Sequence, residues 1–337
     1  MNRHRPIRSI LICFVTYIFL YAFALNYLNI YLFPRRSLAE ISLPSTVTDK
    51  GVLEAVSQDI KIPVPNWLAV EDQSLHLSPD GKLLALSYGD YVLALFSWQK
   101  QKKNSDPFKG LSEEDYEILE DILGHSLDSR LTQAIKRGRG KRQARLWRDH
   151  DHDHIPDSLD IHIGLIKSMR NHARYDETIH GVSYPNGDVD ISVGVCTDVV
   201  VRAYRNAGIN LQQLLIKDMQ RAPQAYALKA GQAPSKGYEH RRVRRLYPYF
   251  KRHFKKLSTQ FDTSTKGEQA WLPGDLLFMS FEPTANRPKH VGLISGHTQL
   301  SGFPLLAHNA ARLFYASEHD ILFAQPLIAR FRVTLPK

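Results

Sequence analysis

The alternation of apolar and polar positions first marks a β-rich stretch in the N-terminal half of the chain. Short apolar runs in Leu75–Trp98 are separated by turn signals at Pro79-Asp80-Gly81 and at Gly89-Asp90. Such runs, bounded by turn residues, are typical of adjacent antiparallel strands. We therefore predict a three-stranded meander, interpreted as a small β-rich, membrane-proximal module within residues 37–110.

A different periodicity follows in residues 111–160. Apolar side chains recur at helical spacing in Leu111–Gly124, after a capping signal at Ser112. This pattern predicts a helix that ends at its glycine. The segment closes with an aspartate-rich stretch at residues 149–160.

The C-terminal half combines both periodicities. From Thr197 the apolar positions recur every three or four residues up to Gly208, a helix stop signal, so Cys196 lies at a predicted helix N-terminus. Apolar runs beginning at Leu276, His290 and Pro304 predict antiparallel strands. Residues 161–337 are therefore expected to form an α+β domain, with the cysteine helix packed on an antiparallel sheet.

The N-terminus predicts the compartment. Three arginines in MNRHRPIR precede an uncharged, mostly apolar run that extends to Phe33. A run of about 20 apolar residues spans a bilayer, and a basic flank stays in the cytoplasm. Residues 1–36 are interpreted as an uncleaved anchor, although Ala22-Phe23-Ala24 leaves a cleaved signal open. We expect a single-pass protein of the inner (cytoplasmic) membrane with its C-terminal domain in the periplasm or outside the cell.

Charge indicates the class of partner. The net charge is +10 with histidine neutral, which favours anionic partners such as nucleic acid, lipid or an acidic wall polymer. Because most of the chain is expected to be exported from the cytoplasm, nucleic acid is disfavoured as a partner. Residues 236–257 hold nine Lys or Arg against one Glu, and Arg241 and Arg242 are candidate substrate contacts. The alternative is a solvated helix face.

The stretch DHDHDHIPDSLD is the strongest metal signal. Its acidic residues occupy positions 1, 3, 5, 9 and 12 of a twelve-residue loop, and the backbone carbonyl of Ile155 could serve at position 7. The motif departs from the calcium-loop pattern at position 6, where His154 replaces the usual glycine. We expect a structural Ca²⁺ site formed by Asp149, Asp151, Asp153, Ile155, Asp157 and Asp160. The interleaved histidines leave a transition-metal site open, and the absence of any metal is a further alternative.

Cysteine usage singles out one thiol. Of the two cysteines, Cys13 lies in the predicted membrane segment, so Cys196 is alone in the exported part. A helix N-terminus stabilises a thiolate through free N–H groups and the helix dipole. His290 is a candidate base because it opens an apolar strand, and Gly292 clears space on the same face. A buried inert thiol and an intermolecular bridge are the alternatives.

Several motifs together carry a family resemblance. GVCTDVV, EHRRV, LPGDLLF, KHVGLIS and AHNAARLF occur in the order and spacing of the bacterial domain-of-unknown-function 1287 family, over about residues 160–336. That family is similar to the NlpC-type, papain-like cysteine peptidases and amidases of the cell wall. The end of the aspartate-rich stretch, IPDSLD, resembles the calcium loops of thrombospondin type 3 repeats.

The first resemblance implies roles for individual residues. Cys196 would be the nucleophile and His290 the base, with His308 or alternatively Asn309 as the third polar residue. The Cys196 backbone N–H would contribute to an oxyanion hole. Asp198 matches the family's Cys-Thr-Asp and is either a substrate contact or an acid that favours the helix dipole. No cofactor is expected for catalysis.

These observations predict a membrane-anchored, extracytoplasmic cysteine hydrolase that cleaves amide bonds in peptidoglycan stem peptides. Two alternatives stay open. One is a catalytically inactive wall-binding or scaffold module with the same fold, and the other is a cysteine peptidase directed at proteins.

Overall fold

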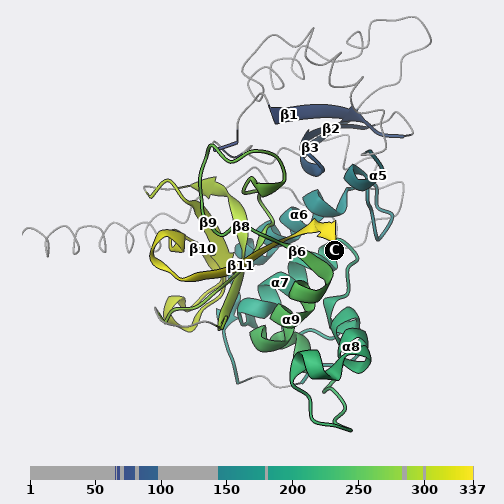
Figure 1. Ribbon diagram of the computed structural model, residues 1–337, viewed down its shortest axis with the longest axis vertical. Coiled ribbons are helices and arrows are strands. Elements are labelled where there is room, and N and C mark those ends of the chain that lie inside the picture. The colour runs from purple at the N-terminus through teal and green to yellow at the C-terminus, as the bar shows by residue number, and fades with distance from the viewer. Residues whose placement is uncertain are drawn as a thin grey trace, which may run out of the picture. The chain divides into compact units, whose positions relative to one another are not determined.

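The computed structural model describes residues 65, 67–68, 72–79, 83–97, 143–178, 181–282, 287–298 and 301–336 (Figure 1). The predicted membrane segment in residues 1–36 and the predicted helix at Leu111–Gly124 lie outside these residues. Within the described part of the chain, no helix combines the length and the apolar character needed to cross a bilayer.

The C-terminal half is built around a six-stranded antiparallel sheet with the order β10-β9-β8-β7-β11-β6. The predicted strands at Leu276, His290 and Pro304 are confirmed and are neighbours in the sheet. Leu276 pairs with Leu293, which in turn pairs with Ala307 on the next strand. The strands are β6 (Phe254–Leu257), β7 (Leu276–Met279), β8 (His290–Thr298), β9 (Pro304–His308), β10 (Ser317–His319) and β11 (Leu327–Pro336).

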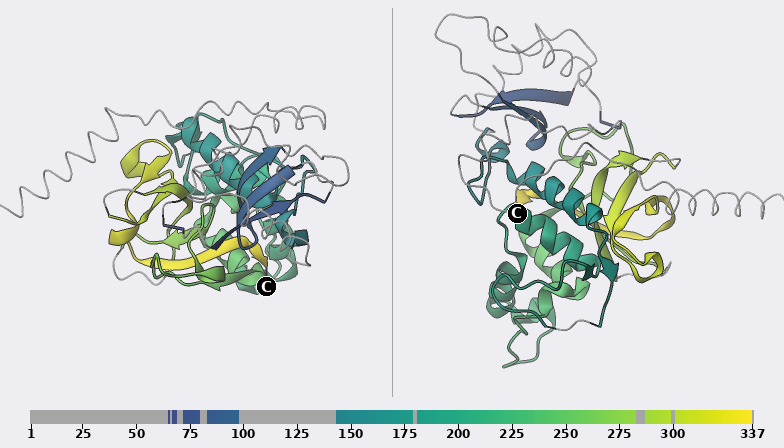
Figure 2. Two further views of the ribbon diagram at one scale, coloured as in Figure 1. Left: turned by 90° about the horizontal axis from the view of Figure 1, so that it is seen from above. Right: turned by 180° about the vertical axis from the view of Figure 1, so that it is seen from behind.

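Helices cover one face of this sheet. In Figure 1, α7 and α9 lie together beside the sheet, and the teal and green helices remain on that side when the molecule is turned (Figure 2). Side chains of α7 such as Val200 share a core with Phe278 and Val291 of the sheet. The helices are α5 (Gln143–Leu146), α6 (Asp157–Arg170), α7 (Cys196–Asn206), α8 (Leu211–Arg221) and α9 (Val243–His253). The α+β class is thus confirmed.

The opposite face of the sheet meets the predicted meander. Strands β1 (Gln73–Leu77), β2 (Leu83–Tyr88) and β3 (Tyr91–Ser97) pair in sequence order and antiparallel, as predicted. Alternate residues of β7 point away from the helices and join a second core with the aromatic residues of the meander. The Trp67 indole also donates to the Trp271 carbonyl at 2.9 Å. The meander and the six-stranded sheet therefore share hydrophobic core.

The Pro-Gly-Asp turn before β7 is held by a buried ion cluster. The Asp275 carboxylate is fully buried and accepts hydrogen bonds from Arg330 at 2.5 Å and Arg332 at 2.7 Å. Gly274 has φ +81°, and a Cβ there would lie 2.8 Å from the Tyr91 hydroxyl. The turn thus joins β7, β11 and the meander at one point.

Helix α6 approaches α7 closely enough to exclude a side chain. A Cβ on Gly164 would lie 2.6 Å from the Asn206 Cβ and 2.9 Å from the Ala203 carbonyl oxygen. A side chain at position 164 would be this close to the backbone of α7, so one of the two helices would have to move to accommodate it. The position of the helix that starts at Cys196 therefore depends on a glycine in α6.

Gly164→Ala should destabilise the protein. Alanine gains about 1 kcal/mol of helix propensity, but forcing α6 and α7 apart costs roughly 1–3 kcal/mol, and the backbone contact makes the steric cost the larger one. Urea unfolding should show a lower midpoint with an unchanged slope. Gln220→Ala, at an exposed position of α8, serves as the control and should stay within about 0.5 kcal/mol of wild type. A Gly164→Ala protein as stable as wild type would show that the helices separate freely.

Candidate active site

Cys196 is the first residue of α7 and is 8% exposed. It follows β5 (Val193–Gly194), which pairs in parallel with β4 (Arg174–Tyr175). The Asp198 carboxylate accepts a hydrogen bond from the Val195 N–H at 2.7 Å and so caps the helix start. A Cβ on Gly194 would lie 3.2 Å from that carboxylate. The glycine therefore makes room for Asp198.

The structure brings Cys196 together with the two strands that carry the candidate histidines. The Val291 backbone N–H hydrogen-bonds to the Cys196 sulfur, and His290 is the preceding residue on β8. His290 Nε2 lies 2.8 Å from His308 Nδ1 on the neighbouring strand β9, with the two rings nearly perpendicular. The Cys196 sulfur thus lies against β8 one residue along from His290, and His308 contacts His290 from β9.

The two alternatives for the third polar residue take different positions. His308 contacts His290 directly. The Asn309 amide instead donates to the carbonyls of Ala173 at 2.9 Å and Gly194 at 3.1 Å. Asn309 therefore holds the segment just before Cys196, and His308 is the residue placed to orient the imidazole of His290.

Burial sets the protonation of the site. It raises the pKa of Cys196 to about 12, although the backbone N–H groups of Val291 and Thr197 oppose this increase. Burial also lowers the pKa of His290 to about 3, and that of His308 well below its usual value. The thiol and both imidazoles are therefore neutral at pH 7. The expectation of a thiolate stabilised by the helix N-terminus is corrected, because desolvation of the sulfur outweighs the N–H groups around it.

The candidate substrate contacts are used within the protein to different extents. Arg241 donates to both oxygens of Asp198, each at 2.9 Å, and each side chain is 3% exposed. This pair ties the start of α7 to the segment before α9. Arg242 stays 30% exposed, with its guanidinium 3.7 Å from the centre of the Tyr238 ring. Arg242 is thus the more accessible of the two arginines.

Tyr175, which the sequence did not indicate, lies beside the strand that leads into Cys196. Tyr175 pairs with Gly194 across β4 and β5, and its hydroxyl donates to Glu177 at 3.2 Å. Burial raises the pKa of Tyr175, and the charge of an ionised Cys196 raises it further. An isolated tyrosine in a two-residue strand carries no pattern that would have indicated this position.

Two exposed aromatic residues contact residues of this region. Phe281 is 43% exposed, and its ring centre lies 4.8 Å from that of His290. Phe314 is 61% exposed, and its carbonyl accepts from the Tyr175 backbone N–H at 2.7 Å.

The aspartate-rich loop brings together part of its predicted ligand set. One carboxylate oxygen each from Asp149, Asp151 and Asp153 lies within 4.8 Å of the others. His154, at the position where calcium loops carry glycine, has φ 72° and so takes the left-handed conformation that glycine favours. The substitution noted in the sequence therefore leaves the turn intact.

The remaining predicted ligands lie in three different settings. Asp157 accepts from the His150 backbone N–H at 2.9 Å, and its other oxygen lies 2.6 Å from the His150 ring, so it is paired. The Ile155 N–H donates to Asp153 at 2.8 Å. Asp160 is 2% exposed in the first turn of α6 and contacts the Asn206 amide at the end of α7.

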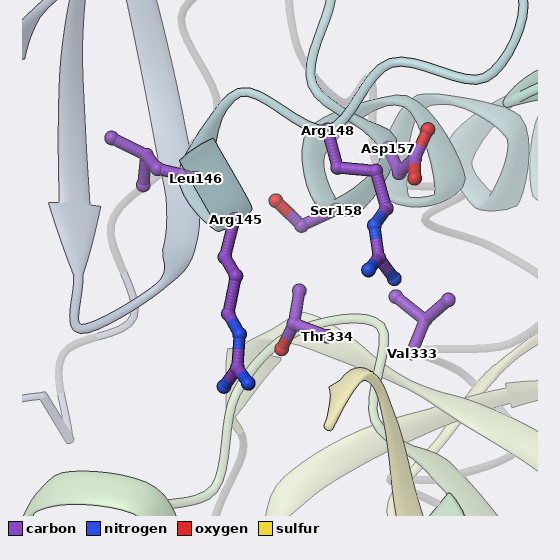
Figure 3. Close-up of a pocket in the computed structure, with 7 residues that line it drawn as sticks. All are labelled: Arg145, Leu146, Arg148, Asp157, Ser158, Val333 and Thr334. Atoms are coloured by element: carbon purple, nitrogen blue, oxygen red, sulfur yellow. The ribbon is translucent and has the colours of Figure 1, made fainter. Parts of the chain in front are cut away.

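A small cavity lies between α5, the start of α6 and β11 (Figure 3). Its lining residues are Arg145, Leu146, Arg148, Asp157, Ser158, Val333 and Thr334, and it has room for about one water molecule. None of these residues belongs to the cysteine site, so this cavity is not a candidate substrate site.

Comparison with known proteins covers the half of the chain that holds the cysteine site. Residues 164–333 match the family described as domain of unknown function (DUF1287). The chain is 33% identical over 162 residues to the uncharacterized protein YijF of Escherichia coli (strain K12), which covers 47% of this chain and 73% of that relative. No solved structure gives a significant match. The matched range includes Cys196, His290 and His308 and begins after the aspartate-rich loop.

The alkylation rate of Cys196 should reveal its raised pKa. With Cys13→Ser to leave one thiol, the folded protein should react with iodoacetamide slowly at pH 7. Because its pKa is about 12, the rate should still climb with pH above pH 10. In urea the same thiol should approach its maximal rate near pH 9, since an exposed cysteine has a pKa of about 8.5. A plateau below pH 8 in the folded protein would instead indicate a stabilised thiolate.

Proposed function

The chain belongs to the DUF1287 family, and we propose that it is a membrane-anchored, extracytoplasmic cysteine hydrolase that cleaves amide bonds in peptidoglycan stem peptides. The observation that carries the proposal is the His290–His308 pair on adjacent strands, together with the contact of the thiol at the start of α7 with Val291, the residue that follows His290. A nucleophile, a base and a group that orients the base are the parts required for nucleophilic amide cleavage.

The order of the elements also supports a papain-like, NlpC-type domain. A helix that begins with the cysteine packs on an antiparallel sheet, and two neighbouring strands of that sheet, β8 and β9, each carry a histidine at one end. This is the arrangement that the family resemblance implies.

The reaction would start from neutral groups. For His290 to take the Cys196 proton, its Nε2 must carry a hydrogen and donate it to His308 Nδ1, which assigns the tautomers of both rings. The sulfur then attacks the carbonyl carbon as its proton moves to His290. The Cys196 backbone N–H would stabilise the oxyanion, and neutral His308 would stabilise the imidazolium.

The second half of the reaction restores the thiol. His290 gives its proton to the leaving nitrogen, the carbon–nitrogen bond breaks, and a thioester remains on Cys196. Water then attacks the thioester as its proton passes to His290. The carboxylic acid leaves, and the proton returns from His290 to the sulfur. No other reactant is consumed.

Charge supports an acidic substrate. The chain carries a net charge of +10, and the part-exposed Arg242 lies in the basic segment of residues 236–257. Peptidoglycan stem peptides carry free carboxylates, which such a surface attracts. The predicted anchor would keep the domain on the side of the membrane where this polymer lies.

A second candidate function is a wall-binding module without turnover. It is favoured by one observation, the burial of Cys196, which leaves the resting thiol neutral and 8% exposed. Both candidates predict binding to the wall, so only product formation separates them.

Incubation of the full chain with purified peptidoglycan, followed by mass spectrometry of the released fragments, tests the proposal. We expect new amine and carboxylate ends with wild type, and a loss of at least a thousandfold in rate with Cys196→Ala, because that variant lacks the nucleophile. His308→Ala should reduce the rate by a smaller factor.

The control is Cys13→Ser, which leaves the only candidate nucleophile in place and should retain full activity. If Cys196→Ala releases the same fragments as wild type, the hydrolase assignment is wrong. If wild type binds the polymer and releases nothing, the binding module is the correct function.

A further inference from the structure

We propose that the loop of residues 149–160 holds a calcium ion through Asp149, Asp151, Asp153 and Asp160, and that the ion fastens this loop to the C-terminal end of α7. This inference is independent of the proposed function, because none of these residues takes part in the cysteine chemistry. The site lies outside the range that matches the DUF1287 family.

The first observation is the convergence of three carboxylates. Oxygens of Asp149, Asp151 and Asp153 lie within 4.8 Å of one another. Oxygens that each lie 2.3–2.6 Å from a common ion, the range typical of Ca²⁺, are separated by distances of this order. One cation could therefore contact all three with small side-chain movements.

The second observation is a buried carboxylate oxygen without a partner. Asp160 is 2% exposed, and its Oδ2 has no hydrogen-bond partner among the residues that the structure describes. Asp153 and Asp151 are the acidic groups that act on it electrostatically, which places it next to the cluster. A buried carboxyl oxygen needs a hydrogen-bond donor or a cation as its partner. An ion held by the three clustered carboxylates would supply that partner.

Among the described residues, Lys167 is the basic group that acts on Asp160, and its ammonium already donates to the Asn206 amide oxygen at 2.7 Å. A divalent ion would add positive charge beside the clustered carboxylates.

The ligand chemistry favours calcium over a transition metal. The His150 ring is paired with Asp157, and His152 and His154 are exposed. In the described part of the chain, the group of potential ligand atoms found here consists of carboxylate oxygens alone. Oxygen donors suit hard cations such as Ca²⁺, whereas zinc and nickel favour imidazole.

The loop is in direct contact with the end of the cysteine helix. The Asn206 amide donates to the Asp160 carbonyl at 3.1 Å and also contacts the Asp160 carboxylate. Gly208, which follows α7, lies so close that a Cβ there would be 2.7 Å from the Asp151 Cβ. An ion bound by Asp151 and Asp160 would therefore hold α6, the loop and the end of α7 together.

Calorimetric titration of the full chain with CaCl2, combined with thermal unfolding in CaCl2 and in EDTA, tests the site. We expect binding at or below about 1 mM, the weak limit for extracellular calcium modules, and a higher unfolding temperature with calcium. MgCl2 should give a smaller shift, because Mg²⁺ demands a tighter octahedral shell.

Two isosteric variants locate the ion. Asp149→Asn and Asp160→Asn should each weaken calcium binding at least tenfold, since each removes a charged ligand. In EDTA, Asp160→Asn should unfold at a higher temperature than wild type, because it relieves repulsion among the carboxylates. A variant that is merely damaged would unfold at a lower temperature. Asp149 lies on the loop itself, so Asp149→Asn still tests the site if the variant of the buried Asp160 does not fold.

Asp262→Asn is the matched control. Asp262 is an exposed acid whose carboxylate accepts from the Ser264 N–H, and its replacement should leave calcium binding unchanged. The proposal is overturned if wild type shows neither heat nor a temperature shift up to 1 mM CaCl2. It is also overturned if both loop variants bind calcium like wild type, or if ZnCl2 stabilises the protein and CaCl2 does not.

Discussion

Burial of the start of α7 against β5 and β8 is the constraint on which the rest of the site depends. It removes water from the Cys196 sulfur and from the His290 imidazole, and this raises the pKa of the first and lowers that of the second. Neither group carries charge in the resting protein. Charge would arise only as a proton moves between them, in surroundings where hydrogen bonds are stronger than in water.

Two buried polar side chains hold the segment around the thiol in place. Asp198 pairs with Arg241 and accepts from the Val195 N–H. The Asn309 amide nitrogen donates to the carbonyls of Ala173 and Gly194, next to and within the β4–β5 pair. These residues are positioned by the need to satisfy buried groups, and in doing so they fix the segment that presents the thiol.

The two ends of α7 are held by different interactions. At its start, the Asp198–Arg241 pair and the strand β8 define where Cys196 lies. At its end, Gly164 admits Asn206 into close contact with α6, and the aspartate-rich loop lies against Gly208. The aspartate-rich loop and the cysteine thus lie at opposite ends of one helix of 11 residues.

The sequence by itself determined the α+β class, the three-stranded meander, the strands that carry His290 and His308, and the position of Cys196 at a helix start. These features follow from local periodicity and turn residues, which act over a few neighbouring positions. Only the tertiary structure decided that His308 rather than Asn309 faces His290, that Arg241 pairs with Asp198, and that Tyr175 pairs with Gly194. The neutral state of the thiol could not be predicted from the sequence either, because desolvation depends on which distant segments exclude water from the sulfur.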